Sequence, residues 1–182
     1  MKVSVSAGHT RSGKDKGAIS PFGVEGELTH EFRTILTNEL RSLGVFTVSD
    51  SDSTIAADTI KFFKSLLGEK SLFIDIHFNS GAETANGAEI IIPDKASSLE
   101  IELATTLQSI LGLHFRNRGV KREKDTARKV IGVLRQLSGI NLLLEICFIS
   151  NKNDVKIYHE NKKKIAKQMA VAIYNFLNKH KL

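Results

Sequence analysis

The amino-acid sequence predicts one α/β domain, in which a mostly parallel, twisted sheet carries helices on both faces. Three observations lead to this prediction. Segments with strand-like apolar patterns alternate along the chain with segments of helical spacing, as in sheets whose parallel strands are joined by helices. The run INLLLEICFIS, at 140–150, is almost continuously apolar, which is typical of a strand covered on both faces. The 182 residues contain no linker or low-complexity run, so we expect a single domain over residues 1–182.

The first half of the chain is expected to supply three strands and two helices. KVSVSAG, at 2–8, alternates as a strand does, and VFTV, at 45–48, and SLFIDIHF, at 71–78, are the next strands. Between them, one helix begins at Glu25 and stops at Gly44, and a second ends near Gly68. The first helix carries its apolar stripe at Leu28, Phe32, Ile35, Leu36, Leu40 and Leu43, and the second presents Ile55, Thr59, Phe62, Phe63, Leu66 and Leu67 on one face.

The second half continues the alternation. GAEIIIP, at 87–93, predicts a strand, and Ser97 with Glu100 forms a capping box that opens a helix over 97–112. The basic segment RNRGVKREKDTARK, at 116–129, is expected to be a loop. After the strand at 140–150, Asn151 can cap a long C-terminal helix. That helix would turn Ile165, Met169, Ala172, Ile173 and Phe176 inward.

Composition limits the classes of function. The formal charge of +6 favours approach to polyanions, such as nucleic acid, an anionic membrane surface or an acidic wall polymer. The basic segment has no interleaved aromatic residues for stacking bases, which disfavours nucleic acid. A single cysteine, Cys147, excludes an internal disulfide framework. The first residues resemble neither a signal peptide nor a membrane span, so if the protein works outside the cytoplasm, we expect another factor to export or release it.

Glu145 is the most informative residue of the sequence. It lies within LLLEICF, where an unpaired carboxylate would cost several kcal/mol. One interpretation is a buried glutamate paired with a structural arginine or lysine. The other is a general base or acid at a catalytic metal site.

Two histidines stand at the ends of predicted parallel strands, where ligand sites of such sheets lie. His9 follows the first strand and His77 ends the third. Catalytic zinc takes three protein ligands and leaves a fourth position open, so an acidic residue could complete the set. Helical phase places Glu25 on the stripe that faces the sheet, whereas Glu27 lies about 200° away, on the outer face, at ~100° per residue.

Other polar residues are weaker candidates. Asp75 shares strand parity with His77 and could support it or be an ordinary buried aspartate. Cys147 shares parity with Glu145, and we expect it to be a buried apolar residue. Arg118, Lys121 or Arg135 could contact carboxylates of an acidic substrate, and Asn79 is a further candidate substrate contact. The remaining histidines are expected at the surface: His30, His114, His159 and His180.

Four segments, in this order along the chain, resemble the zinc-dependent N-acetylmuramoyl-L-alanine amidases of the amidase-3 type, which include bacteriophage endolysins. AGHT with KGA is similar to the first zinc histidine and its turn, and VEGELT resembles the zinc glutamate segment. DIHFNS followed by NGAEIII is similar to the second zinc histidine and its adjacent strand, and LLLEICFISNKND resembles the segment of the catalytic glutamate.

The resemblance implies a phosphorylase/hydrolase-like fold, Zn²⁺ held by His9, Glu25 and His77, and Glu145 as the catalytic residue. It implies cleavage of the amide between N-acetylmuramic acid and L-alanine of peptidoglycan. The substrate would be a muropeptide, and we expect Asn79, Arg118 and Arg135 to contact it. We expect a monomer that acts at the cell wall after holin-type release and inserts into no membrane. Two alternatives stay open: a zinc peptidase of stem peptides, and a metal-free module that binds the wall or other polyanions.

Overall fold

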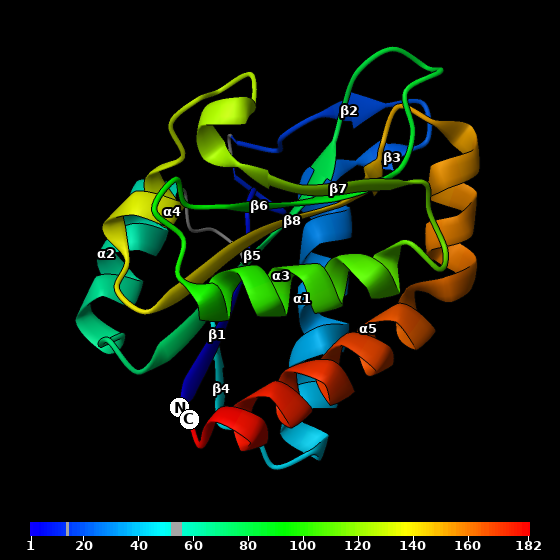
Figure 1. Cartoon of the computed structure of the whole chain (residues 1–182). Helices are drawn as coiled ribbons and strands as arrows, with labels where there is room; N and C mark the ends of the chain where they lie inside the picture. Colours follow the sequence, from blue (N-terminus) through cyan, green and yellow to red (C-terminus); the bar gives the residue numbers. More distant parts are fainter. Residues whose placement is uncertain (14, 52–55) are drawn as a thin grey trace.

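A computed structural model of the chain, which describes residues 1–13, 15–51 and 56–182, shows a six-stranded sheet with helices on both faces (Figure 1). The expected α/β class is confirmed. The strands are β1 (Lys2–Ala7), β2 (Ile19–Ser20), β3 (Gly23–Val24), β4 (Thr47–Ser49), β5 (Ser71–Asn79), β6 (Ala88–Ile92), β7 (Asn117–Arg122) and β8 (Ile140–Phe148). The helices are α1 (Glu25–Ser42), α2 (Ala56–Leu66), α3 (Ser98–Leu111), α4 (Gly132–Gln136) and α5 (Lys152–His180), with a 3₁₀ turn, η1, at Glu123–Asp125.

The main sheet has the order β4-β1-β5-β8-β6-β7. Strands β4, β1, β5 and β8 are mutually parallel, which confirms the mostly parallel sheet. Strand β6 runs antiparallel to β8, and β7 is parallel to β6. A separate two-stranded ladder of β2 and β3, which the sequence did not indicate, leads into α1.

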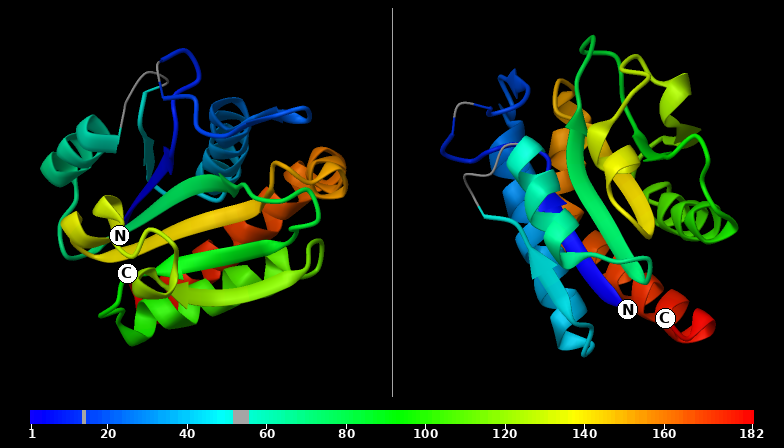
Figure 2. Two further views of the ribbon diagram at one scale, coloured as in Figure 1. Left: turned by 90° about the horizontal axis from the view of Figure 1, so that it is seen from above. Right: turned by 90° about the vertical axis from the view of Figure 1, so that its left-hand side faces the viewer.

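The helices form two unequal layers (Figures 1 and 2). Helices α1, α3 and α5 bury their apolar residues in the larger core on one face, whereas α2 and α4 supply a smaller cluster on the other. The two chain ends lie side by side in every view, and Met1 and Leu182 both pack against the larger core. None of the helices in the described ranges combines the length and apolar character that a bilayer crossing requires.

The side chains of β5 alternate between the two faces of the sheet, and this alternation determines which residues lie beside each helix layer. Leu72, Ile74 and Ile76 are fully buried in the larger core, and Phe73 belongs to the smaller cluster. Because successive side chains of a strand point to opposite faces, Asp75 and His77 share the side of Phe73. The thinner layer covers this side, so polar groups near the ends of the strands lie there beside a cavity.

A β-bulge in β8 interrupts this alternation just beyond Glu145. His77 pairs with Glu145, but Asn79 pairs with Phe148, so β8 holds one residue more than β5 over this stretch. Cys147 consequently belongs to the larger core, fully buried, and its predicted parity with Glu145 is wrong. Its expected character as a small buried apolar residue is confirmed. Phe148 instead lines the cavity on the Glu145 side.

Most expected element boundaries agree with the structure, and the capping predictions are confirmed. Ser97 and Glu100 form the reciprocal capping box of α3. The Asn151 side chain accepts hydrogen bonds from two backbone N–H groups in the first turn of α5. The strand predicted at 45–48 lies slightly later, as β4.

Two predictions fail for identifiable reasons. The basic segment at 116–129 is not only a loop, because 117–122 forms β7 at the sheet edge. Its charged side chains concealed the strand, yet charge is common on edge strands because it opposes pairing with other chains. On α2 the buried residues are Thr59, Ile60 and Phe63, while Phe62 is 40% exposed. The short helix buries only a narrow stripe, and Ile55 lies outside the described residues.

A buried ion pair joins α1 to the ends of β1 and β4. Asp50, which follows β4, accepts hydrogen bonds from Ser6 Oγ, at 3.2 Å, and from the Ala7 backbone N–H, at 3.3 Å. Arg33 of α1 approaches the same carboxylate, with Nη1 2.8 Å from Oδ1. Burial raises the pKa of Asp50, and the charge of Arg33 opposes that rise. The pair fixes the end of β1, from which Gly8 and His9 follow.

We predict that Arg33→Met lowers the free energy of unfolding by about 3 to 5 kcal/mol, because it leaves the Asp50 carboxylate buried without its counter-ion. Urea unfolding measures the loss. The double variant Arg33→Met/Asp50→Leu removes both charges and should recover much of it. If Arg33→Met lowered the free energy of unfolding by less than the double variant does, this explanation would be contradicted.

Candidate metal centre and active site

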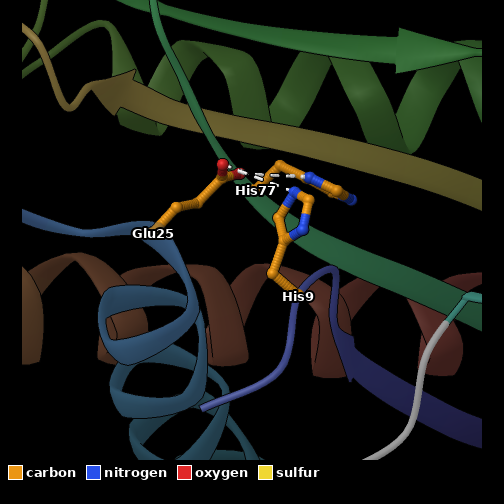
Figure 3. A group of neighbouring side chains, drawn as sticks. All are labelled: His9, Glu25 and His77. Atoms are coloured by element: carbon orange, nitrogen blue, oxygen red, sulfur yellow. Dashed lines mark hydrogen bonds and ion pairs between the residues drawn. The ribbon is translucent and has the colours of Figure 1, made fainter. Parts of the chain in front are cut away.

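Three side chains from distant parts of the chain converge at one end of the sheet (Figure 3). His9 Nε2 lies 3.4 Å from Glu25 Oε2, and His77 Nδ1 lies 3.3 Å from Glu25 Oε1. One nitrogen or oxygen atom of each residue lies within 4.8 Å of the others. The two imidazole rings meet edge to face, with their centroids 5.1 Å apart. The sequence prediction that these three residues come together is consistent with this geometry.

Each residue reaches the centre from a different kind of element. His9 stands in the loop that follows β1, Glu25 is the first residue of α1, and His77 lies near the end of β5. Helical phase separates the two candidate glutamates as expected: Glu25 is 4% exposed, whereas Glu27 faces solvent.

Backbone groups fix the Glu25 carboxylate. Oε2 accepts a hydrogen bond from the Ala18 N–H at 2.9 Å, and Oε1 accepts one from the Phe78 N–H at 3.1 Å. The carboxylate therefore bridges the loop before α1 and the end of β5. These hydrogen bonds hold both oxygens in a fixed orientation.

The second nitrogen of each histidine faces an aspartate. Asp15 Oδ1 lies 2.9 Å from His9 Nδ1, and Asp75 Oδ2 lies 3.2 Å from His77 Nε2. Carboxylates in this position hold the ring and its tautomer, and they make the ligating nitrogen more basic. The sequence suggested such a role for Asp75 but gave no reason to select Asp15, which lies in an irregular loop.

Two glycines let the chain pass directly against the ligand side chains. A Cβ atom at Gly8 would lie 2.0 Å from His77 Nε2. At Gly17, a Cβ atom would lie 2.6 Å from Glu25 Oε2, and φ is +67°, a conformation that residues with side chains rarely adopt. The space around the three side chains therefore requires glycine at both positions.

The centre attracts positive charge. Burial alone would lower the pKa of His77, but the charge and hydrogen bond of Asp75 and the hydrogen bond to Glu25 raise it well above its ordinary value. Burial likewise would raise the pKa of Glu25, and the hydrogen bond and charge of His77 bring it below its ordinary value. Both shifts have the same origin, because carboxylates surround the His77 imidazole and favour a positive charge at this position.

Glu145 stands directly beside His77 in the sheet, because the two residues are register partners in β8 and β5. Burial raises the pKa of the Glu145 carboxyl to about 7, against the opposing charge of His77. Its Oε2 atom is buried without a hydrogen-bond partner among the described residues. Within the described ranges no arginine or lysine forms an ion pair with Glu145, although the charge of Arg128 opposes the rise of its pKa, so the predicted structural ion pair has no direct contact to support it.

The donor set fits a zinc-type ion. Two imidazole nitrogens and a carboxylate oxygen are ligands that zinc accepts, and three protein ligands leave one position for water or substrate, as catalytic zinc sites do. Carboxylates stand behind both imidazoles, and the unpartnered oxygen of Glu145 lies nearby. Such a centre can polarise a carbonyl group and transfer protons next to it.

The centre opens into a cavity of about 910 Å³, lined by His9, Glu25, His77 and Glu145 together with two of the predicted substrate contacts. Those two are Asn79 and Arg118. The third, Arg135, is absent from the described residues that line the cavity. Its Nε donates to Glu123 at 2.8 Å, and its Nη2 lies 3.3 Å from Asp94. Substrate contact by Arg135 stays a prediction.

The sequence analysis was wrong about the location of His30 and did not identify Glu89 as a residue of the cavity. His30, expected at the surface, is 3% exposed, and its Nε2 lies 3.0 Å from the His9 carbonyl oxygen, because the loop after β1 folds over α1. Of the other histidines, His159 is exposed, and His114 and His180 are partly exposed. Glu89 of β6, the register partner of Glu145, was overlooked. The argument applied to Glu145, a carboxylate within an apolar strand, would have identified it.

The sequence profile of the family described as N-acetylmuramoyl-L-alanine amidase matches residues 3–178 of this chain. The protein YqiI of Bacillus subtilis (strain 168) is 31% identical over 156 residues, which cover 84% of this chain and 72% of YqiI.

Solved structures share the fold. The catalytic domain of the CD27L endolysin targeting Clostridia difficile superposes with a TM-score of 0.79 at 23% identity, covering 96% of this chain and 97% of that one. An N-acetylmuramoyl-L-alanine amidase from Clostridium difficile 630 superposes with a TM-score of 0.82, also at 23% identity, covering 97% and 96%.

We predict that Gly8→Ala abolishes high-affinity zinc binding, since the added methyl group would occupy the place of the His77 ring. Isothermal titration calorimetry of the metal-free protein measures the affinity. A matched control is Gly68→Ala, where a Cβ atom would meet nothing within 4 Å. Equal zinc affinity in the two variants would contradict this prediction, because it would show that the His77 ring can bind the ion from a different position.

Proposed function

Because this chain belongs to the N-acetylmuramoyl-L-alanine amidase family, we propose that it hydrolyses the amide between N-acetylmuramic acid and L-alanine with a zinc ion held by His9, Glu25 and His77. The proposal rests on the convergence of these three donors beside Glu145, whose buried Oε2 atom has no hydrogen-bond partner in the part of the chain that the structure describes. The enzyme class and its action on peptidoglycan follow from the family, and the zinc ion and the roles of individual residues are our inference.

When bound, zinc acts as a Lewis acid on the amide carbonyl and lowers the pKa of a bound water to about 7. The protein prepares the ligands for this ion: backbone N–H groups orient Glu25, and Asp15 and Asp75 orient the two imidazoles. Little rearrangement is then needed on binding, which favours both affinity and a fixed geometry.

Glu145 serves as the proton carrier. Its carboxylate accepts a proton from the attacking water and passes it to the nitrogen of L-alanine as the amide bond breaks. Burial places its pKa near neutrality in the metal-free protein, and a cation beside it shifts the pKa downward, toward the ionised form that accepts a proton. The apolar flanks of β8 keep this group away from competing hydrogen-bond partners.

The substrate places the reaction at the cell wall, where peptidoglycan lies. The net charge of +6 supports attraction to that anionic surface. Wall lysis after holin-type release and a monomeric state remain part of this proposal, and release assays and sedimentation would test them.

Digestion of a defined muropeptide tests the reaction. We expect the products to be an intact glycan and a stem peptide with a new L-alanine amine terminus, both identified by mass analysis. Chelation should abolish their formation, and zinc should restore it. New amines inside the stem would instead indicate the zinc peptidase, and wall binding without any product would indicate the metal-free binding module.

Substitutions at the centre should separate proton transfer from metal binding. We expect Glu145→Gln to retain stoichiometric zinc and lower kcat by about 10²- to 10⁴-fold, because the amide side chain cannot carry the proton. His77→Ala should lose the zinc as well, which elemental analysis of the purified protein measures. Wild-type turnover in Glu145→Gln would contradict the assigned role.

A further inference from the structure

A second group of polar and charged residues borders the same cavity. We call Asn79, Glu89, Arg118 and Lys121 the Glu89 cluster. Glu89 Oε2 accepts from Arg118 Nε at 2.7 Å and from Lys121 Nζ at 2.6 Å, and Oε1 accepts from Asn79 Nδ2 at 3.0 Å. Glu89 is 5% exposed, and all four residues line the cavity.

Sheet register places this cluster next to the metal centre. Glu89 of β6 is the partner of Glu145 in β8, and Glu145 is in turn the partner of His77 in β5. Adjacent strands lie about 5 Å apart, so a substrate bound at the metal centre would extend over the cluster within one residue or two.

Within the described part of the chain, the contacts of Arg118 leave the two Nη groups of its guanidinium free to donate hydrogen bonds to a ligand. Its guanidinium carbon lies 4.9 Å from the centroid of the Phe148 ring, and only its Nε is used by Glu89. Neither Nη group has a hydrogen-bond partner among the described residues. A purely structural arginine–carboxylate pair commonly uses two parallel hydrogen bonds, so this arrangement leaves a planar pair of donors for another carboxylate.

The cluster carries an excess of positive charge. Two cations face one carboxylate, and both remain partly exposed, with side-chain exposures of 27% for Arg118 and 31% for Lys121. Burial would raise the pKa of Glu89, but the hydrogen bonds and charges of Lys121 and Arg118 bring it below its ordinary value. Glu89 therefore stays ionised and keeps both cations in place.

We propose that the Glu89 cluster is a specificity subsite that binds a free carboxylate on the stem-peptide residue following L-alanine. The Nη groups of Arg118 donate to that carboxylate, and Lys121 adds charge. Glu89 acts through Arg118 and is a positioning residue. The inference rests on the proposed amidase function, since that function fixes where the stem peptide lies.

The test uses two muropeptides that differ only at the glutamate after L-alanine, which carries either a free α-carboxylate or a carboxamide. We expect the wild-type enzyme to favour the carboxylate form at least about tenfold in kcat/KM, mainly through KM, as one charge-assisted contact allows. Arg118→Gln should abolish the preference, and Arg118→Lys, which keeps the charge without the planar donors, should retain part of it. Glu89→Gln should reduce the preference by raising KM for the carboxylate form, because Arg118 loses the partner that holds it.

Arg116→Gln is the matched control, because it removes the same charge from an exposed side chain two residues earlier, outside the lining of the cavity. It should retain the full preference. No preference in the wild type, or the same ratio in Arg118→Gln and Arg116→Gln, would overturn the proposal. Thermal unfolding verifies that each variant is folded, and Arg118→Lys replaces Arg118→Gln in the comparison if the latter does not fold.

Binding separates this proposal from the amidase function itself. Calorimetric titration of both muropeptides into zinc-loaded Glu145→Gln should give a lower Kd for the carboxylate form, and the added Arg118→Gln substitution should equalise the two values. If neither muropeptide is cleaved by the wild type but the Kd values differ in this way, the function fails and the subsite stands. Equal Kd values without the Arg118 substitution would refute the subsite.

Discussion

The Glu25 carboxylate is the interaction on which the rest of the site depends. It is the first residue of α1, yet its oxygens contact backbone groups of a preceding loop and of β5, and they face both histidines. If the loop or β5 moved away, the buried Glu25 carboxylate would lose its hydrogen-bond partners. That loss would destabilise the fold by several kcal/mol. The need to satisfy one buried charge thus brings together segments more than 50 residues apart.

The cleft arranges its charges in two regions that differ in sign. At the metal centre, carboxylates outnumber the two imidazoles, so the region favours a cation. Across one strand, at the Glu89 cluster, two cations outnumber one carboxylate, so that region favours an anion. Glu145 lies between them in the sheet. A substrate with a polarisable amide at one end and an acidic group nearby would be complementary to these two regions. Long-range electrostatics would then orient the substrate before close contacts form.

Periodicity in the sequence predicted the central strands and the longer helices, and it placed the three candidate metal ligands at one edge of the sheet, because these features depend on local patterns. His9 follows its strand, His77 lies near the end of its strand and Glu145 lies within an apolar strand. Helical phase alone separates Glu25 from Glu27. What escaped prediction depends on contacts between distant segments. The pairing of Asp15 with His9 arises in an irregular loop, and the burial of His30 results from that loop folding over α1. Strand β7 was hidden because its charged residues find partners on β6 rather than showing an apolar pattern.

The extra residue in β8 also determines the chemistry available in the cleft. Without it, regular alternation would turn the chain's single thiol toward the metal centre and an aromatic ring toward the core. Thiolates are soft ligands that bind zinc strongly and favour different metals from those preferred by mixed imidazole and carboxylate sites. By shifting the register within a single strand, the bulge keeps sulfur out of the coordination environment. At the proposed zinc site, this local irregularity would thereby preserve the metal selectivity of the imidazole and carboxylate ligands and spare the site oxidative damage to a cysteine ligand.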